Sequence, residues 1–306
     1  MKEKEEEKVF PKVRLNWFPG HMAKTLRQIE ADLKLVDLVI ELLDARIPIS
    51  SQNPETKKLI ADKKRIVILN KSDLADEKEN IKWVNKFESQ NIPAILCNSN
   101  TGEGTSKITS RIEKLMEEEK QKAEAKGRIG KIIRVMIIGV PNVGKSSLIN
   151  RMAQKTSAQV GNKPGVTKQK QWIRLSNNIE LLDTPGVLWP RLDNQKVALN
   201  LAYTGTIKNE VLDDQDVAYN LLKYLIEEYR QNVIQRYALR EDIIDAILHN
   251  KELEENEQIV EIMNYIGEKR GAIAKGNNID LEKVSRIILD DFRSGNLGKI
   301  TLEKVN

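Results

Sequence analysis

Short apolar runs alternate with amphipathic stretches from about residue 24 to residue 205. The apolar runs have the length of buried strands and fall at residues 36–43, 65–69, 93–97, 132–138, 172–175 and 179–182. The stretches with helical spacing fall at residues 23–35, 53–62, 77–90, 107–126 and 147–152. Strands joined through helices make right-handed crossovers. The pattern therefore predicts an α/β domain whose mostly parallel sheet carries helices on both faces, with a hairpin at 172–182.

The strand pattern ends at about residue 205. Beyond it, apolar residues recur three and four positions apart at 217–230, 241–248, 257–269 and 281–293. This spacing predicts an all-helical second domain, with the boundary near residues 205–212. We therefore divide the chain into a charged, disordered tail at 1–8, an α/β domain at 9–206 and a helical domain at 207–306.

The composition is typical of a globular protein. The 306 residues are 31% charged and 40% hydrophobic. No apolar run reaches the roughly 18 residues that a membrane span needs, and residues 1–8 are too charged for a secretory signal. Cys97 is the only cysteine, so it cannot form an internal disulfide. We expect a cytoplasmic monomer without a membrane span, in which Cys97 is a small buried residue.

Charge is distributed unevenly between the two predicted domains. Residues 207–306 contain 14 Lys and Arg against 20 Asp and Glu, whereas residues 1–206 contain 36 against 25. The excess positive charge of the α/β half suggests a polyanionic partner, although ordinary surface solvation explains it equally well. Any RNA contact by the acidic helical domain needs a local basic patch, and residues 269–275 are the candidate.

The sequence Gly139-Val-Pro-Asn-Val-Gly-Lys-Ser146 matches the phosphate-loop pattern G-x-x-x-x-G-K-[ST]. It follows a predicted strand and precedes a predicted helix, which is the context this motif requires. Backbone amides of such a loop close around the β-phosphate, while Lys145 would reach the β- and γ-phosphates and Ser146 would bind Mg²⁺. The expected nucleotide-binding residues are Asn142, Val143, Gly144, Lys145, Ser146 and Ser147.

Two features downstream of this loop would sense the γ-phosphate. In Asp183-Thr-Pro-Gly186, Asp183 can hold the Mg²⁺ shell and the Gly186 amide can contact the phosphate. Thr167 lies in the Lys- and Gly-rich stretch 155–171, and its hydroxyl would complete the Mg²⁺ shell. A flexible basic loop is the alternative for that stretch. Lys145 and Thr167 are also expected to contribute to catalysis.

The sequence Asn70-Lys-Ser-Asp73 follows a buried strand and matches the guanine-reading pattern N-K-x-D. The Asp73 carboxylate can accept hydrogen bonds from N1–H and the 2-amino group of guanine. Adenine offers no such pair and would leave Asp73 desolvated and unpaired. The strand at 93–97 leads to a loosely matched loop that would back the base. The expected base-binding residues are Asn70, Lys71, Ser72, Asp73, Asn98 and Ser99.

The order of these motifs is rotated, because the base motif precedes the phosphate loop. The order N-K-x-D, base loop, phosphate loop, Thr167 and D-x-P-G is that of the circularly permuted GTPases. Among them, Asn16-Trp-Phe-Pro-Gly-His-Met-Ala-Lys24 and Asp44-Ala-Arg-Ile-Pro48 resemble signatures of the ribosome biogenesis GTPase A family. The resemblance covers the whole chain. It implies a GTPase that binds a late precursor of the large (50S) ribosomal subunit, contacts rRNA and ribosomal proteins, and leaves after hydrolysis.

The resemblance also bears on how hydrolysis is assisted. Val187 stands where Ras-like proteins carry the Gln that orients water. In the family a histidine at the position of His21 is implicated in catalysis, with the ribosomal particle positioning it; packing or RNA contact is the alternative. In some related GTPases an Asn at the position of Asn142 helps to bind K⁺, although Asn142 also suits a turn. The expected cofactors are GTP or GDP, Mg²⁺ and K⁺.

Two alternatives from other classes stay open. One is an RNA-binding module in which GTP locks a conformation with little turnover, since a catalytic Gln is missing. The other is a permuted GTPase of small-subunit assembly. Those relatives usually carry an N-terminal oligonucleotide-binding barrel and a zinc site, so the single cysteine and the helical C-terminus count against it.

Overall fold

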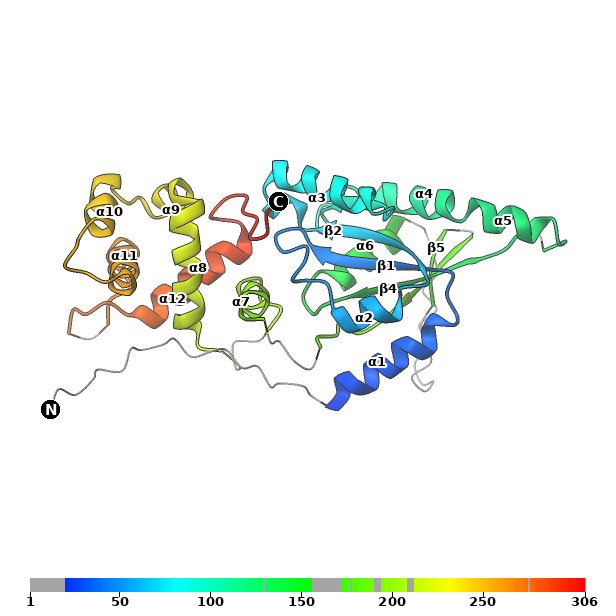
Figure 1. The fold of residues 1–306 in the computed structure, drawn as a ribbon, viewed down its shortest axis with the longest axis horizontal. Coiled ribbons are helices and arrows are strands. Elements are labelled where there is room, and N and C mark those ends of the chain that lie inside the picture. Colours follow the sequence, from blue (N-terminus) through cyan, green and yellow to red (C-terminus); the bar gives the residue numbers. More distant parts are fainter. Residues whose placement is uncertain are drawn as a thin grey trace.

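A mixed six-stranded sheet forms the centre of the protein (Figure 1). The computed structural model describes residues 20–128, 130–155, 172–176, 178–189, 194–207, 212–274 and 276–305. The strand order is β3-β2-β1-β4-β6-β5, and all neighbours are parallel except β5 and β6, which are antiparallel. The predicted parallel sheet with its hairpin is therefore confirmed. The strands are β1 (Leu38–Asp44), β2 (Lys64–Asn70), β3 (Ala94–Cys97), β4 (Ile133–Gly139), β5 (Trp172–Ser176) and β6 (Ile179–Asp183).

Helices cover both sides of this sheet, as the alternating pattern predicts. In Figure 1, α1 and α2 run along one side, and α4 and α5 run along the other. The central strand β1 is buried along its whole length, which is typical of parallel strands covered on both faces. Cys97 is buried at the end of β3, as expected. The elements are α1 (Gly20–Leu33), α2 (Pro54–Leu59), α3 (Glu77–Ser89), α4 (Thr105–Leu115), α5 (Glu117–Glu124), α6 (Lys145–Lys155) and the short 3₁₀ helix η1 (Ser72–Leu74).

The single helix predicted at 107–126 is wrong, because the chain forms two helices that meet at Met116. The Met116 side chain is buried, and Lys64 Nζ donates a hydrogen bond of 2.8 Å to the Leu115 carbonyl oxygen. The second helix begins with acidic residues, which are favourable at a helix N-terminus. The pattern that looks continuous in the sequence is thus interrupted where Lys64 binds the Leu115 carbonyl oxygen, which a continuous helix would use itself.

From residue 195 onward, a part called the helical half below, the described regular elements are helices, as predicted for residues 207–306. Helix α8 packs against α7, α9, α11 and α12. Helices α7 and α9 were not predicted; in α9 only Val233 and Tyr237 are buried, so its apolar pattern is weak. The described helices here are α7 (Gln195–Tyr203), α8 (Asp214–Glu228), α9 (Arg230–Tyr237), α10 (Glu241–Leu248), α11 (Glu255–Arg270) and α12 (Leu281–Ser294).

The segment after α12 returns to the α/β half, where the C-terminus lies beside α3 in Figure 1. Ile300 N donates to the Leu74 carbonyl oxygen, and Leu302 N donates to that of Arg46, both at 2.9 Å. The Glu303 carboxylate accepts hydrogen bonds from Ser50 and from Asn200 on α7. The two halves of the protein are therefore held together by the end of the chain. Within the described ranges, no helix combines the length and apolar character needed to cross a membrane.

Candidate nucleotide-binding site

The predicted motifs meet at one edge of the sheet. Because the strands are parallel, their carboxyl ends lie together, and loops that follow them gather there. The registers place Asp44 opposite Asn70, and Asn70 opposite Cys97. On the other side, β1 pairs with β4 near Gly139, and Ile137 pairs with Asp183. Segments distant in the sequence thus form one continuous row of loops.

The phosphate loop connects β4 to α6, which begins at Lys145. Asn142 and Gly144 have positive φ values of 57° and 101°. A Cβ on Gly144 would lie 2.3 Å from Asn70 Nδ2, so only glycine fits there. Val143 is buried, whereas Ser146 and Ser147 are exposed at the start of α6. The loop is therefore compact, and Ser146 stays accessible at the start of α6.

Asn70 joins three loops into one unit. Its side chain is fully buried and donates to the Val143 carbonyl oxygen at 2.8 Å and to Ser99 Oγ at 3.1 Å. Its Oδ1 accepts from Ser99 N at 3.0 Å. Both ends of the Asn70 amide are thus bound to protein atoms, and Asn70 connects the base motif, the base loop and the phosphate loop.

Lys71 bridges the phosphate loop and a buried ion pair. Its Nζ donates to the Asn142 carbonyl oxygen at 2.9 Å and lies 3.1 Å from Asp44 Oδ2. Arg46 binds the same carboxylate, with Nη2 at 2.8 Å from Oδ2 and Nε at 3.0 Å from Oδ1. Burial alone would raise the pKa of Asp44, but the charges of Arg46 and Lys71 hold that pKa well below its usual value.

Arg46 carries this connection into the helical half. Its guanidinium lies 5.1 Å from the centre of the Phe292 ring on α12 and donates to the Phe292 carbonyl oxygen at 3.4 Å. Only 1% of Arg46 is exposed. Sequence reasoning noted Asp44 and Arg46 as part of a signature but gave them no role. Two opposite charges two positions apart, directly after an apolar strand, are the signal that indicates a buried pair.

The remaining base-motif residues differ in exposure. Asp73 lies exposed in η1, while Ser72 Oγ donates to the Cys97 carbonyl oxygen at 3.1 Å. Asn98 Oδ1 accepts hydrogen bonds from the backbone of Asn100 and Thr101 at 2.9 and 3.1 Å, so Asn98 shapes its own loop. Asp73 is the predicted base-motif carboxylate that faces solvent.

The phosphate end has a different electrostatic character. Burial lowers the pKa of Lys145 below its ordinary value, and partial desolvation raises the pKa of Asp183 despite the nearby Lys145 charge. An anion beside Lys145 would stabilise its positive charge, and a cation beside Asp183 would stabilise its negative charge. The hydroxyl of Ser146 and the carboxylate of Asp183 are hard oxygen ligands of the kind that suits Mg²⁺.

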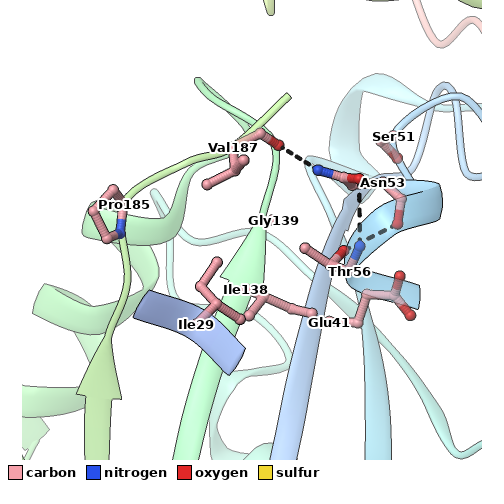
Figure 2. A pocket seen from close by; sticks show the side chains of 9 residues that line it. All are labelled: Ile29, Glu41, Ser51, Asn53, Thr56, Ile138, Gly139, Pro185 and Val187. Atoms are coloured by element: carbon pink, nitrogen blue, oxygen red, sulfur yellow. Dashed lines mark hydrogen bonds between the residues drawn. The ribbon is translucent and has the colours of Figure 1, made fainter. Parts of the chain in front are cut away.

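The segment after Asp183 packs closely on the phosphate loop. Thr184 Oγ1 donates to the Ile137 carbonyl oxygen at 2.6 Å. A Cβ on Gly186 would lie 2.9 Å from Pro141 Cα and 3.1 Å from Lys145 Nζ, so a side chain there would collide with the loop. Val187 is buried and points toward the interior beside Pro185 (Figure 2). The backbone of Gly186 therefore lies against the residues expected to bind phosphate.

A second connection leads from the phosphate loop to the helical half. Asn142 Nδ2 donates to the Gly205 carbonyl oxygen at 2.7 Å, just after α7. Arg293 of α12 donates to the carbonyl oxygens of Ala202 and Tyr203 at 2.9 and 3.1 Å. The loop that would hold the phosphates is thus linked through the end of α7 to α12.

Two predicted catalytic residues cannot be compared with the structure. Thr167 lies outside the described residues. His21 belongs to the first turn of α1, but its side chain also lies outside the described part of the chain. Later in α1, Ile29 is buried and lies near Pro185 and Val187 in Figure 2. Helix α1 therefore runs beside the segment that follows Asp183.

Comparison with protein families gives two matches to GTPase models. Residues 134–270 match the model described as 50S ribosome-binding GTPase. Residues 57–192 match the model described as RsgA GTPase. The first match begins in β4 and includes both the phosphate loop and helices of the second half.

Similar proteins cover almost the whole chain. Ribosome biogenesis GTPase A from Bacillus cereus is 43% identical over 94% of this chain and 93% of its own length. Mitochondrial ribosome-associated GTPase 1 from Mus musculus is 34% identical over 94% of this chain and 90% of its own. Among solved structures, GNP-bound YlqF from T. maritima aligns with a TM-score of 0.62 at 26% identity, covering 92% of this chain and 98% of that one.

Proposed function

Because this chain belongs to the ribosome biogenesis GTPase A family, we propose that it acts on a late precursor of the large (50S) ribosomal subunit. The protein is a circularly permuted GTPase that binds GTP and GDP, in this class generally with Mg²⁺, and hydrolyses GTP. The match to a 50S ribosome-binding GTPase model over residues 134–270 supports the large subunit as the partner. On that particle the protein contacts rRNA and ribosomal proteins and leaves after hydrolysis. It acts in the cytoplasm as a monomer.

One observation supports the nucleotide site most strongly, namely that the base motif and the phosphate loop are bound to each other. Asn70 reaches Val143, and Lys71 reaches Asn142, at 2.8 and 2.9 Å. A single guanine nucleotide would span this junction, with Asp73 accepting from the base. The phosphates would lie against the backbone of residues 142–147 and Gly186, and Lys145 would neutralise their charge. Ser146, Asp183 and Thr167 would hold Mg²⁺, which supplies positive charge at the β- and γ-phosphate oxygens.

Hydrolysis needs a group that the segment after Gly186 does not supply. Val187 and Leu188 are both buried and apolar, so neither orients a water molecule. We assign that role to His21, because α1 runs beside this segment and His21 lies in its first turn. The separation from Ile29 is eight residues, or about 12 Å along the helix. The ribosomal particle would then move or fix the beginning of α1.

Asn142 is our candidate ligand for K⁺. Its side-chain nitrogen already donates to Gly205, so its side-chain oxygen is the atom left for a cation. A potassium ion there would add positive charge beside the phosphates, where other GTPases use an arginine. Replacement of K⁺ by Na⁺ should therefore slow turnover.

Release from the particle requires that the helical domain, residues 207–306, responds to the nucleotide. We propose two routes for this response: contacts from Lys71 through Asp44 and Arg46 to α12, and the contact of Asn142 with Gly205.

The candidate RNA patch at 269–275 offers fewer free charges than its sequence suggests. Arg270 donates to the Arg236 carbonyl oxygen at 2.6 Å, Lys269 lies over the Tyr265 ring, and Lys275 is outside the described residues.

The test compares GTP turnover by the purified protein alone, with large-subunit precursors and with small-subunit particles, each in K⁺ and in Na⁺. We expect stimulation by the large-subunit precursors alone, greater in K⁺. Cross-linking with a non-hydrolysable GTP analogue should then identify the rRNA and proteins contacted. No stimulation under any condition would contradict the proposal, and stimulation by small-subunit particles would redirect it.

A further inference from the structure

We propose that Asn53 is a positioning residue that holds the γ-phosphate-sensing segment, residues 184–188, in the arrangement that accepts GTP. Asn53 lies at the start of α2, far in the sequence from the phosphate loop and from residues 183–186. Its Nδ2 donates a hydrogen bond of 3.0 Å to the Val187 carbonyl oxygen (Figure 2). Its described hydrogen bonds go to Val187 and to the first turn of α2 and not to the phosphate loop, the N-K-x-D motif or residues 183–186, so its effect would reach the phosphate through Gly186.

The Asn53 side chain uses its two ends for different partners. Its Oδ1 caps α2 by accepting from the backbone of Glu55 at 2.9 Å and of Thr56 at 3.4 Å. The cap fixes the orientation of the amide, so that Nδ2 points at Val187. Only 3% of Asn53 is exposed, which protects the bond from competition with solvent.

The segment it holds has few other polar supports among the described contacts. Thr184 Oγ1 binds the Ile137 carbonyl oxygen at one end. At the other end, Val187 N donates to the Gly139 carbonyl oxygen at 3.4 Å, which is long for a hydrogen bond. Gly186 lies between these two anchors. The shorter bond from Asn53 therefore determines how closely the Gly186 backbone lies to Pro141 and Lys145.

The surroundings offer no good replacement for this bond. Asn53, Thr56, Glu41 and Val187 line a cavity of about 10 Å³, which is at the lower limit for a single water molecule. The neighbouring Glu41 is 2% exposed, and one of its oxygens makes no hydrogen bond to the described residues. Its other oxygen pairs with Arg65 Nη1 at 3.3 Å, and in Figure 2 the carboxyl group points away from the Val187 carbonyl, so Glu41 does not take over the bond. Loss of the Asn53 amide would thus release the segment.

The test separates the donor from the cap. Asn53→Asp keeps an oxygen that caps α2 and replaces the donor with a second acceptor, whereas Asn53→Ser keeps a good cap but is too short to reach Val187. Thr56→Val is the matched control, since it removes the Thr56 Oγ1 bond to the Asn53 carbonyl oxygen and leaves the Val187 contact in place. Affinities for GDP and for a non-hydrolysable GTP analogue are measured on the purified full chain with Mg²⁺.

We expect both Asn53 variants to bind the GTP analogue about tenfold more weakly, the usual consequence of losing one buried hydrogen bond. Binding of GDP should stay within about twofold, as should both affinities of Thr56→Val. If one of the two Asn53 variants does not fold, the nucleotide affinities of the other variant test the proposal. An equal loss for the two nucleotides, no loss, or tighter binding of the analogue would overturn the proposal. The inference rests on the GTPase activity but not on the ribosomal partner, so either can fail alone.

Discussion

The two ends of the nucleotide site differ in how they are built. At the base end, Asn70 and Asp44 are buried and bound to protein atoms, Lys71 binds Asn142 and Asp44, and Arg46 extends the connection to α12. At the phosphate end, Lys145 is half-buried and Asp183 is exposed, and partial desolvation shifts the pKa of each group away from its charged form. The contacts among Asn70, Lys71, Asp44 and Arg46 are thus complete without a ligand, whereas at the phosphate end a ligand would supply the missing counter-charges. The free energy of unfolding should therefore depend on the base end, and the rate of GTP hydrolysis should depend on the phosphate end.

The largest expected effect is at the base end, on removing Arg46. Arg46→Ala leaves the Asp44 carboxylate buried beside Lys71 alone, and breaking a buried pair costs about 3–5 kcal/mol of the free energy of unfolding. Urea denaturation measures the loss. The control is Arg240→Ala, whose pair with Asp242 is exposed and should contribute less than about 1 kcal/mol. Similar losses of unfolding free energy for Arg46→Ala and Arg240→Ala would show that the buried ion pair at the base end does not stabilise the fold.

At the phosphate end, His21→Ala should affect the rate instead. We expect particle-stimulated turnover to fall about 10²-fold, the lower end for a lost acid–base group, with nucleotide affinity nearly intact. His249→Ala is the control, because His249 is exposed at the end of α10 and should change nothing. Full turnover in His21→Ala would remove this residue from the mechanism.

Asp73→Asn tests the exposed part of the base end. The variant loses a charged acceptor for guanine, so GTP affinity should fall roughly 10- to 100-fold and preference should shift toward xanthine nucleotides. Because Asp73 is exposed, the free energy of unfolding should not change. Titration calorimetry with GTP and XTP gives the preference. An unchanged preference would assign base recognition to another group.

The smallest effect should come from Asp183→Asn. Folding raises the pKa of Asp183, so its ionised form is less favourable in the folded state than in the unfolded chain. The variant should therefore be slightly more stable than the wild type at pH 7 without nucleotide, by less than about 1 kcal/mol. The difference should vanish below about pH 4, where the unfolded Asp is also protonated. A destabilised variant at pH 7 would mean that Asp183 supports the fold as Asp44 does.

The sequence predicts the parts of this site better than their connections. The motif loops follow predictable strands, and their order along the chain indicates the permuted sheet. The contact of Arg46 with Phe292 joins residues 246 positions apart, and no local pattern predicts it. The return of the chain end to Ser50 and Leu74 is also a tertiary effect.

Local sequence patterns also give a wrong or incomplete prediction where a single tertiary contact determines the structure. Met116 continues a helical pattern, yet α4 ends before it, where Lys64 binds the Leu115 carbonyl oxygen. The sequence predicts a helix that starts at Asn53, but it does not show that the Asn53 side chain caps α2 and reaches Val187. These connections depend on the packed sheet, because only its register brings the loops together.

The difference between the two ends is tested most directly by hydrogen–deuterium exchange of the protein bound to GDP and to a non-hydrolysable GTP analogue. Both ligands carry guanine, so only the phosphate end changes. We predict that the analogue increases protection of residues 139–147 and 183–188 and leaves residues 66–73 and 97–103 unaltered. Equal changes in both sets, or a change confined to the base end, would contradict this account.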